Sequence, residues 1–274
     1  MPVHSIVCIK SVVRTAPDGV GRRTPDNSEL NPFDRPALEA ALRLKAALGG
    51  SVTALSMGPP VSAEVLAEAQ AMGVDRAVLI CGPALAGSDT LVTARVLAAG
   101  IARLMPYDIV FFGTRTSDSD TGQVGPQSAT VLAIPFIGGV KQLEPALTDP
   151  LADAPTAPGA TASHWRLQRL IDGWEESWQV QSPMAVTIHP RAYQARSIAL
   201  GGIAAAHAPL DIQTWGLADV GMSVDSVGLA GSPTRVSNLR KIKRPRTCRM
   251  LTGEPREQVD ALIEELTTKG ILGS

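Results

Sequence analysis

The chain has 274 residues, of which 45% are apolar and 19% charged, and its formal net charge is −1. This length and composition are typical of a globular protein with a hydrophobic core of its own. The near-neutral charge argues against a protein that coats nucleic acid, and 4% aromatic residues are too few for a base-stacking surface. Because no apolar run approaches ~20 residues and no basic-then-apolar leader precedes the first strand, we expect a cytoplasmic protein without membrane insertion.

Cysteine and histidine do not predict a disulfide framework or a metal centre. The three cysteines are an odd number and form no C-x-x-C pair, and the four histidines are spread along the chain. A metal site assembled in space is the alternative, and we predict no metal. The residues concerned are Cys8, Cys81, Cys248, His4, His164, His189 and His207.

In the first half of the chain, short apolar runs alternate with helical patterns, which predicts an α/β fold with a parallel sheet flanked by helices. Strands are predicted at 6–9, 52–57, 77–81 and 108–112. Helices are predicted from Asn31–Asp34 to Leu48, from a Ser62 cap to Gly73, from Ser88 or Asp89 to about Leu104, and from about Gln123 to Leu132.

The second half has a different character. Residues 145–163 are rich in Pro and Ala without periodicity, which predicts a loop insertion. Strands at 165–171 and 175–180 flank Asp172-Gly173, a hairpin signal, and a further strand is predicted at 184–188. The tryptophans of the hairpin are expected to pack on a sheet face; they are Trp165, Trp174 and Trp178.

After about residue 190 the signals weaken until a helix that begins at Glu254-Pro255 and ends at Gly270. A stretch of this length without a core of its own suggests an arm that packs on another protein. We therefore divide the chain into an α/β domain at 1–210 and an extended carboxy-terminal arm at 211–274 that wraps a partner.

The strongest local signal is the polar loop Gly113–Pro126, which leaves a predicted strand and leads into a helix. Its backbone N–H groups and the helix dipole favour phosphate at the strand ends. A well-capped polar loop without a ligand is the alternative. Asp118 and Asp120 repel phosphate and are better suited to bond loop amides or ribose hydroxyls. The loop matches neither a Walker A motif nor a G-x-G-x-x-G fingerprint.

No pattern predicts catalysis by this chain alone. G-x-S-x-G and H-E-x-x-H motifs are absent, and we assign no catalytic residue. Six basic residues lie between Arg240 and Arg249. A solvated run or a contact with an acidic partner is the favoured interpretation, and a nucleic-acid patch is the alternative.

Several segments together resemble the β-subunit of electron-transfer flavoproteins, and the resemblance spans Ile6 to about Gly231. It is closest to the branch that includes electron-bifurcating members. The order and spacing of the segments carry it, and they are Val7–Lys10, Asn31–Asp34, Ala37–Lys45, Ser56–Pro60, Ala71–Arg76, Gly87–Thr93, Asp120–Pro126 and Gly228–Thr234.

The resemblance implies a Rossmann-like fold, an adenine nucleotide in this chain, and a heterodimer with an α-subunit that carries FAD. It implies electron transfer between a flavin dehydrogenase, of acyl-CoA type or similar, and NADH or a quinone reductase. By position, it implies partner docking through Arg196 and Leu200. The cofactor-binding residues that it implies are Cys8, Asn31, Pro32, Phe33, Asp34, Met57, Thr90, Thr93, Gly113, Thr114, Arg115, Asp118, Asp120, Thr121, Gly122, Gln123 and Val124.

Two nucleotides fit the resemblance. Ordinary carriers hold AMP, whereas the bifurcating branch holds a second FAD, and Asp89–Thr93 favours FAD. An ATP- or AMP-binding sensor of universal-stress type on a similar fold is the alternative function. The long tail after residue 210 argues against that sensor, and a structural subunit with an empty site stays open as a third interpretation.

Overall fold

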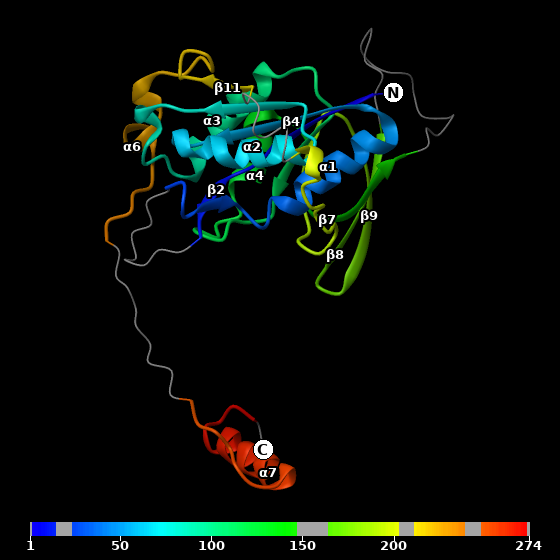
Figure 1. Cartoon of the computed structure of the whole chain (residues 1–274), viewed down its shortest axis with the longest axis vertical. Helices are drawn as coiled ribbons and strands as arrows, with labels where there is room; N and C mark the ends of the chain where they lie inside the picture. The colour runs from blue at the N-terminus through cyan, green and yellow to red at the C-terminus, as the bar shows by residue number, and fades with distance from the viewer. Residues whose placement is uncertain (1, 15–23, 147–163, 203–210, 239–247, 273–274) are drawn as a thin grey trace. The chain divides into compact units, whose positions relative to one another are not determined.

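The computed structural model describes residues 2–14, 24–146, 164–202, 211–238 and 248–272. A nine-stranded sheet forms its centre, in the order β11-β5-β4-β1-β6-β10-β7-β8-β9 (Figure 1). The strands are β1 (Val3–Cys8), β4 (Gly50–Met57), β5 (Arg76–Ile80), β6 (Ile109–Gly113), β7 (Phe136–Pro145), β8 (His164–Ile171), β9 (Trp174–Gln181), β10 (Met184–Ile188) and β11 (Ile212–Trp215). The first seven in the sheet order pair in parallel, and β8 and β9 extend one side antiparallel. The predicted α/β class with a parallel sheet flanked by helices, Rossmann-like in character, is confirmed.

Helices cover both faces of the sheet. Helices α1 and α2 pack on one face, and α3 and α4 pack on the other. Their bounds are α1 (Arg35–Leu48), α2 (Ala63–Met72), α3 (Thr90–Arg103) and α4 (Val124–Leu132). A short antiparallel ladder joins β2 (Ser11–Val13) to β3 (Ser28–Leu30).

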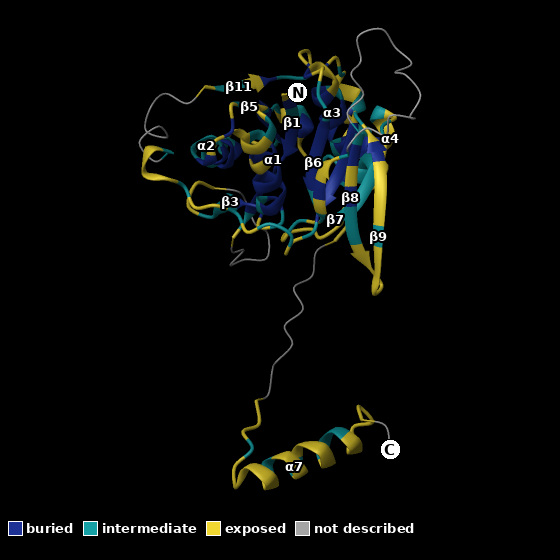
Figure 2. Cartoon of the chain, turned by 90° about the vertical axis from the view of Figure 1, so that its right-hand side faces the viewer, coloured by how far each residue is buried: buried dark blue, intermediate teal, exposed yellow. Residues whose placement is uncertain are grey.

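The core lies in two layers, because side chains alternate across each buried strand. In β6, Ile109 and Phe111 belong to the layer under α1 and α2, whereas Val110 and Phe112 belong to the layer under α3 and α4. Figure 2 shows β1 and β6 buried in dark blue, in contrast with the exposed β9. Burial on both faces explains why the central strands are near-continuous apolar runs in the sequence.

The predicted hairpin is confirmed, and its turn has the backbone that a two-residue hairpin needs. Asp172 and Gly173 both have positive φ angles, 49° and 82°. The tryptophans behave differently from one another. Trp165 is 1% exposed and packs in the core as predicted, but Trp174 is 76% exposed and does not pack on the sheet.

One local expectation needs correction, and two strands were not predicted. Ser62 precedes α2 but its side chain makes no capping hydrogen bond, and the backbone turn of a short 3-10 helix (Pro60–Ser62) leads into the helix instead. Strand β7 was not predicted, because its two glycines and its bulge interrupt the alternation of apolar and polar residues. Strand β11, a four-residue strand at the far edge of the sheet, was not predicted either.

The contacts divide the chain into two compact units, residues 1–236 and 237–274. The division falls after the boundary expected at 210, because β11 joins the sheet and Trp215, Val220 and Val227 belong to its core. The second unit contains α7 (Pro255–Thr268), as predicted. None of the residues of α7 is buried. Most of the insertion predicted at 145–163 and of the basic run 240–249 lies outside the described residues.

Two further observations bear on function. None of the helices in the described parts of the chain is both long and apolar enough to cross a bilayer. Within the same residues, no group of three or more His, Cys, Asp or Glu side chains is placed to hold a metal ion.

Candidate functional site

The topology of the sheet selects one edge as the candidate site. From β1 the chain builds outward to β4 and β5 on one side, and then crosses to β6 on the other side. The strand order therefore reverses between β1 and β6, and open α/β sheets bind ligands outside the carboxyl ends of the strands at such a point. Cys8 ends β1 and Gly113 ends β6. The cofactor-binding residues predicted from the resemblance cluster at or near this edge.

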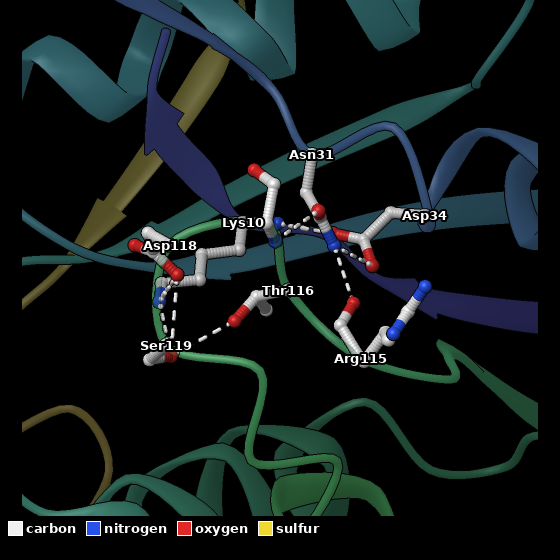
Figure 3. A network of polar contacts seen from close by, with 8 residues as sticks. Lys10, Asn31, Asp34, Arg115, Thr116, Asp118 and Ser119 are labelled. Carbon is white, nitrogen blue, oxygen red and sulfur yellow. Dashed lines mark hydrogen bonds and ion pairs between the residues drawn. The ribbon is translucent and has the colours of Figure 1, made fainter. Parts of the chain in front are cut away.

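Asn31 connects two segments at this edge, as Figure 3 shows. Its side-chain amide donates to Asp34 Oδ1 at 2.8 Å and to the carbonyl oxygen of Arg115 at 2.9 Å. Its Oδ1 accepts from the Ser117 amide at 3.3 Å. The side chain is fully buried, so these bonds fix the loop after β6 against the start of α1.

Asp34 is a buried carboxylate between β1 and β6. The backbone N–H of Lys10 donates to its Oδ2 at 2.8 Å, in addition to the bond from Asn31. Burial raises the pKa of Asp34 to about 7, although these hydrogen bonds act in the opposite direction. Burial and the charge of Asp34 also raise the pKa of the Cys8 thiol, so Cys8 stays a neutral, apolar side chain at the end of β1.

The strand-to-loop junction at Gly113 has no room for a side chain. A Cβ there would lie 2.2 Å from Asp34 Oδ1 and 2.7 Å from the Phe33 carbonyl oxygen. Further along the loop, Asp120 and Gly122 have φ angles of 52° and 61°. These left-handed positions turn the loop back toward α4, and Gly122 meets them without a Cβ penalty.

A lysine that the sequence analysis did not select closes the network. Lys10 Nζ donates to Asp118 Oδ1 at 2.8 Å, and the Ser119 hydroxyl donates to the same oxygen at 3.2 Å. Burial alone would raise the pKa of Asp118, but these bonds and the charge of Lys10 lower it below its ordinary value. A lysine directly after a buried strand at the switch point was the signal that could have identified Lys10.

Two cationic groups line the edge. One is Lys10, and the other is Arg115, whose guanidinium lies 4.4 Å from the centre of the Phe33 ring. Arg115 is exposed and reaches Asp120 only at 3.5 Å, so this surface ion pair is weak. Pro32 and Thr121 lie exposed at the rim.

The first turn of α3 lies beside the end of this loop. Asp89 caps the helix by accepting from the Val92 amide at 3.0 Å. The Thr90 hydroxyl donates to Gln123 Oε1 at 3.3 Å, which joins α3 to the residue before α4. Thr93 follows one turn later, and its amide donates to the Asp89 carbonyl at 2.9 Å.

The same turn of α3 fastens a distant segment. The amide and hydroxyl of Thr234 donate to Asp89 Oδ2 at 3.0 and 2.7 Å. The Asp89 amide donates to the Ser232 hydroxyl at 2.9 Å. Two segments that the resemblance singled out, Gly87–Thr93 and Gly228–Thr234, are therefore in direct contact, which spacing alone could not reveal.

The remaining predicted residues complete the edge. Met57 at the end of β4 and Val124 at the start of α4 are half-buried against the core under α3 and α4. The Thr114 hydroxyl is buried and has no hydrogen-bond partner within the structure. The side chain of Gln123 does not cap α4. The free backbone amides in the first turn of α4 can therefore donate to another acceptor. The edge offers donors, cations and an apolar wall, which suit a nucleotide better than acid–base chemistry.

The two predicted docking residues lie in the segment after β10. Leu200 is 86% exposed, so it does not pack against the described residues of its own chain. Arg196 instead contacts its own chain, because its Nε donates to Glu39 Oε2 on α1 at 2.8 Å. The sequence analysis did not identify Glu39.

Comparison with known families identifies the family to which the chain belongs. The family described as "Electron transfer flavoprotein domain" matches residues 21–218, well over half of the chain. The chain belongs to the electron transfer flavoprotein family. The predicted resemblance is thereby confirmed.

Individual relatives agree with this family. The chain is 35% identical to the electron transfer flavoprotein subunit beta of Clostridium acetobutylicum over 252 residues, 88% of this chain and 90% of the relative. It is 34% identical to the caffeyl-CoA reductase-Etf complex subunit CarD of Acetobacterium woodii over 247 residues, 89% and 88% of the two chains. It is 32% identical to the acryloyl-CoA reductase electron transfer subunit gamma of Anaerotignum propionicum over 281 residues, 97% and 98%.

These relatives bear on the electron-transfer and sensor interpretations that the sequence analysis compared. A function like that of an electron transfer flavoprotein β-subunit is supported, and the stress-type sensor is not.

Proposed function

We propose that this chain is the β-subunit of a heterodimeric electron transfer flavoprotein and holds an adenine nucleotide, FAD or AMP, at the carboxyl edge of β1, β4 and β6. An α-subunit with its own FAD completes the heterodimer. Electrons pass between a dehydrogenase of acyl-CoA type and NADH or a quinone reductase. The polar network at the β1–β6 switch point carries the nucleotide part of the proposal.

The residues at this edge fit such a nucleotide. The buried Thr114 hydroxyl has no hydrogen-bond partner among the described residues, and a bound ligand would satisfy it. The amides at the start of α4 and the cations Lys10 and Arg115 favour phosphate groups. Gly113 lets Asp34 and Phe33 pack directly against the end of β6, because a Cβ there would collide with both, and this close packing fixes the start of the loop that faces the nucleotide.

Each part of the edge has a distinct role toward the nucleotide. The apolar side chains of Cys8 and Met57, which end the neighbouring strands β1 and β4, would flank the adenine ring of a bound nucleotide. Asn31 and Asp34 do not reach out; they hold the loop 113–124 in the conformation that presents its amides. When bound, the flavin supplies the redox chemistry, and this chain orients it and excludes water.

We favour FAD over AMP in this chain because of α3. The Thr90 hydroxyl lies against Gln123 at the end of the loop, so the first turn of α3 extends the polar edge beyond the loop itself. Thr90 and Thr93 are thus available to a group larger than AMP, such as the remainder of FAD.

Counting released nucleotides tests this choice. The purified heterodimer is denatured, and its FAD and AMP are quantified per heterodimer by chromatography. Two FAD support the second flavin. One FAD with one AMP contradicts it but keeps the nucleotide site, and one FAD alone contradicts the nucleotide site of this chain.

A matched pair of variants locates the second FAD. Thr90→Val removes the hydroxyl next to Gln123 and should lower retention of this chain's FAD severalfold while leaving the α-subunit FAD in place. Thr130→Val on α4 is the control, because its hydroxyl only returns to the Pro126 carbonyl at 2.9 Å. Equal flavin retention in the two variants would remove Thr90 from the site.

The partner part of the proposal rests on exposed apolar side chains. On α7, Val259, Leu262 and Ile263 are 53%, 45% and 49% exposed. An exposed apolar helix face of this kind is typical of a surface that binds another protein. We propose that the α-subunit covers it, so the carboxy-terminal arm wraps the partner.

Docking of the dehydrogenase is proposed to use Leu200. An apolar side chain that is 86% exposed can enter a pocket of the partner and act as a hot spot in a small interface. Leu200→Ala should slow electron delivery by the dehydrogenase and leave flavin content unchanged. Unaltered kinetics would contradict this docking site.

A further inference from the structure

Glu39 is a carboxylate away from the nucleotide edge that accepts four hydrogen bonds. It lies on the second turn of α1, and its side chain is 5% exposed. Its Oε2 accepts from Arg196 Nε at 2.8 Å and from the Arg196 backbone amide at 3.2 Å. Its Oε1 accepts from Arg196 Nη2 at 3.3 Å and from Arg43 Nε at 2.8 Å. Two guanidinium groups therefore share one shielded carboxylate.

The contact to the Arg196 backbone amide matters for the path of the chain. A side-chain ion pair alone would hold only a guanidinium, and its long stem could still move. Glu39 also binds main chain, and so fixes the segment itself against α1 four residues before Leu200. The Arg43 guanidinium lies 5.5 Å from the centre of the Tyr193 ring, which adds a contact on the approach to Arg196.

A second contact holds the other side of Leu200. Gly202 lies so close to α2 that a Cβ would be 2.2 Å from the Ala71 carbonyl oxygen. Between the two fixed points, Ile198 is partly buried against the core under α1 and α2. Among the large apolar side chains of this segment, Leu200 is the one presented to solvent, at 86% exposure. The backbone is thus anchored on both sides of one projecting apolar side chain.

Removal of the carboxylate would release this arrangement. Without Glu39, the guanidinium groups of Arg43 and Arg196 would face each other without an acceptor and repel. The Arg196 amide would lose its partner as well. The anchor at Gly202 would remain, so the segment would lose order around Leu200 without detaching from the domain.

We propose that Glu39 is a positioning residue for electron transfer: it holds the segment 196–202 on α1 so that Leu200 is presented, preordered, to a flavin dehydrogenase that acts on acyl-CoA thioesters. The inference rests on the proposed docking role of Leu200. Preordering lowers the entropy lost when the partner binds, so its loss weakens association and leaves the electron-transfer step itself intact. Because α1 begins directly after Asp34, the docking segment and the nucleotide edge are built on one helix.

The test uses the intact heterodimer with Glu39→Gln. Acyl-CoA dehydrogenases of the source organism are assayed one at a time, and the one that reduces the wild-type heterodimer is used for all variants. We expect the KM for the heterodimer to rise about tenfold, with kcat and flavin content unchanged. Hydrogen exchange of the amides at 195–202 should become faster.

Glu68→Gln is the matched control. Glu68 on α2 accepts from Arg35 of α1 at 2.7 Å, so Glu68→Gln also removes an ion pair of α1 but leaves the bonds between Glu39 and Arg196 in place. Its KM should stay within twofold of the wild type. An equal rise in KM for both variants would mean a general effect on α1 and would overturn the proposal.

A double-mutant cycle separates positioning from a merely structural role. In a Leu200→Ala background, Glu39→Gln should raise KM no further, because the side chain that it presents is gone. Additive effects would overturn the inference, and so would an unchanged KM in Glu39→Gln when Leu200→Ala raises it. If Leu200→Ala itself has no effect, the docking proposal fails first, and that outcome is distinct.

Discussion

The loop edge at the β1–β6 switch point and helix α7 differ in the origin of their order. The edge is cross-linked by the buried groups Asn31 and Asp34, and the side chain of Asn31 bonds residues 84 and 86 positions away in the sequence. Helix α7 has no buried residue and relies on local devices, namely its capping box and the ion pair of Lys269 with Glu265. An isolated helix of fourteen residues is marginal in water. The first region is ordered by contacts within this chain, whereas the second exposes apolar side chains that the proposed partner would cover.

The largest expected effect breaks the partner side of this comparison. Leu262→Ser together with Ile263→Ser should weaken α-subunit association by at least about a hundredfold, or about 3 kcal/mol, because two apolar side chains lose burial. Light scattering after size exclusion measures the association. Asp260→Ser with Glu264→Ser is the control on the same helix. Retained association of the apolar variant would show that α7 is not covered by the α-subunit.

The next largest effect tests the close packing of Gly113 against Asp34 and Phe33 at the loop edge. Gly113→Ala places a methyl group against Asp34 and Phe33 and should cost about 2–3 kcal/mol of unfolding free energy, with loss of the nucleotide. Denaturant unfolding and nucleotide analysis check both. Gly82→Ala is the control, because nothing lies within 4 Å of its Cβ position. A stable, nucleotide-loaded Gly113→Ala variant would contradict the packing.

The pH dependence of stability tests the burial of Asp34 in the same region. The pKa of Asp34 is about 7 in the fold, above the ordinary value of 3.8, so unfolding releases its proton between these values. Stability should therefore fall as pH rises from 5 to 6.5, by about 2 kcal/mol relative to Asp34→Asn. Denaturant unfolding at fixed protein concentration measures this difference. Asp118→Asn should not change the slope, because the pKa of Asp118 lies below its ordinary value.

The smallest effect concerns the contact between α3 and the segment 228–234. Asp89→Ala removes both the helix cap and the acceptor of Thr234 and should cost about 1 kcal/mol. Asp89→Asn keeps one oxygen for the Val92 amide and should cost less. Faster amide exchange at Thr234 would accompany both variants, and unchanged exchange would argue that the segment is held elsewhere.

The sequence predicted the elements whose signal is local. The strands of the first half of the chain are continuous apolar runs, and the start of α3 was predictable from Asp89, which caps it. Strand β11 was not predicted because four residues at a sheet edge are too few to show an alternation of apolar and polar residues. Strand β7 was not predicted because Gly138 and Gly139 interrupt that alternation. Secondary structure of this kind is decided by tertiary pairing.

The site was predictable in part for the same reason. The loop 113–124 stood out by its glycines and hydroxyl groups, whereas the roles of Lys10 and Glu39 depend on partners 108 and 157 residues away. Trp174 was expected to pack and is exposed, since a hairpin at the sheet edge leaves one face uncovered.

The position of β10 has a consequence for how the chain is made. Strand β10 lies between β6 and β7, yet it is synthesised after both. A nascent chain that ends before residue 184 therefore presents two unpaired strand edges, which are prone to wrong pairing. The centre of the sheet can close only after residue 188 has left the ribosome. Pauses in translation ahead of this point would prolong the exposure, whereas pauses after it would leave β11 to add to the opposite edge.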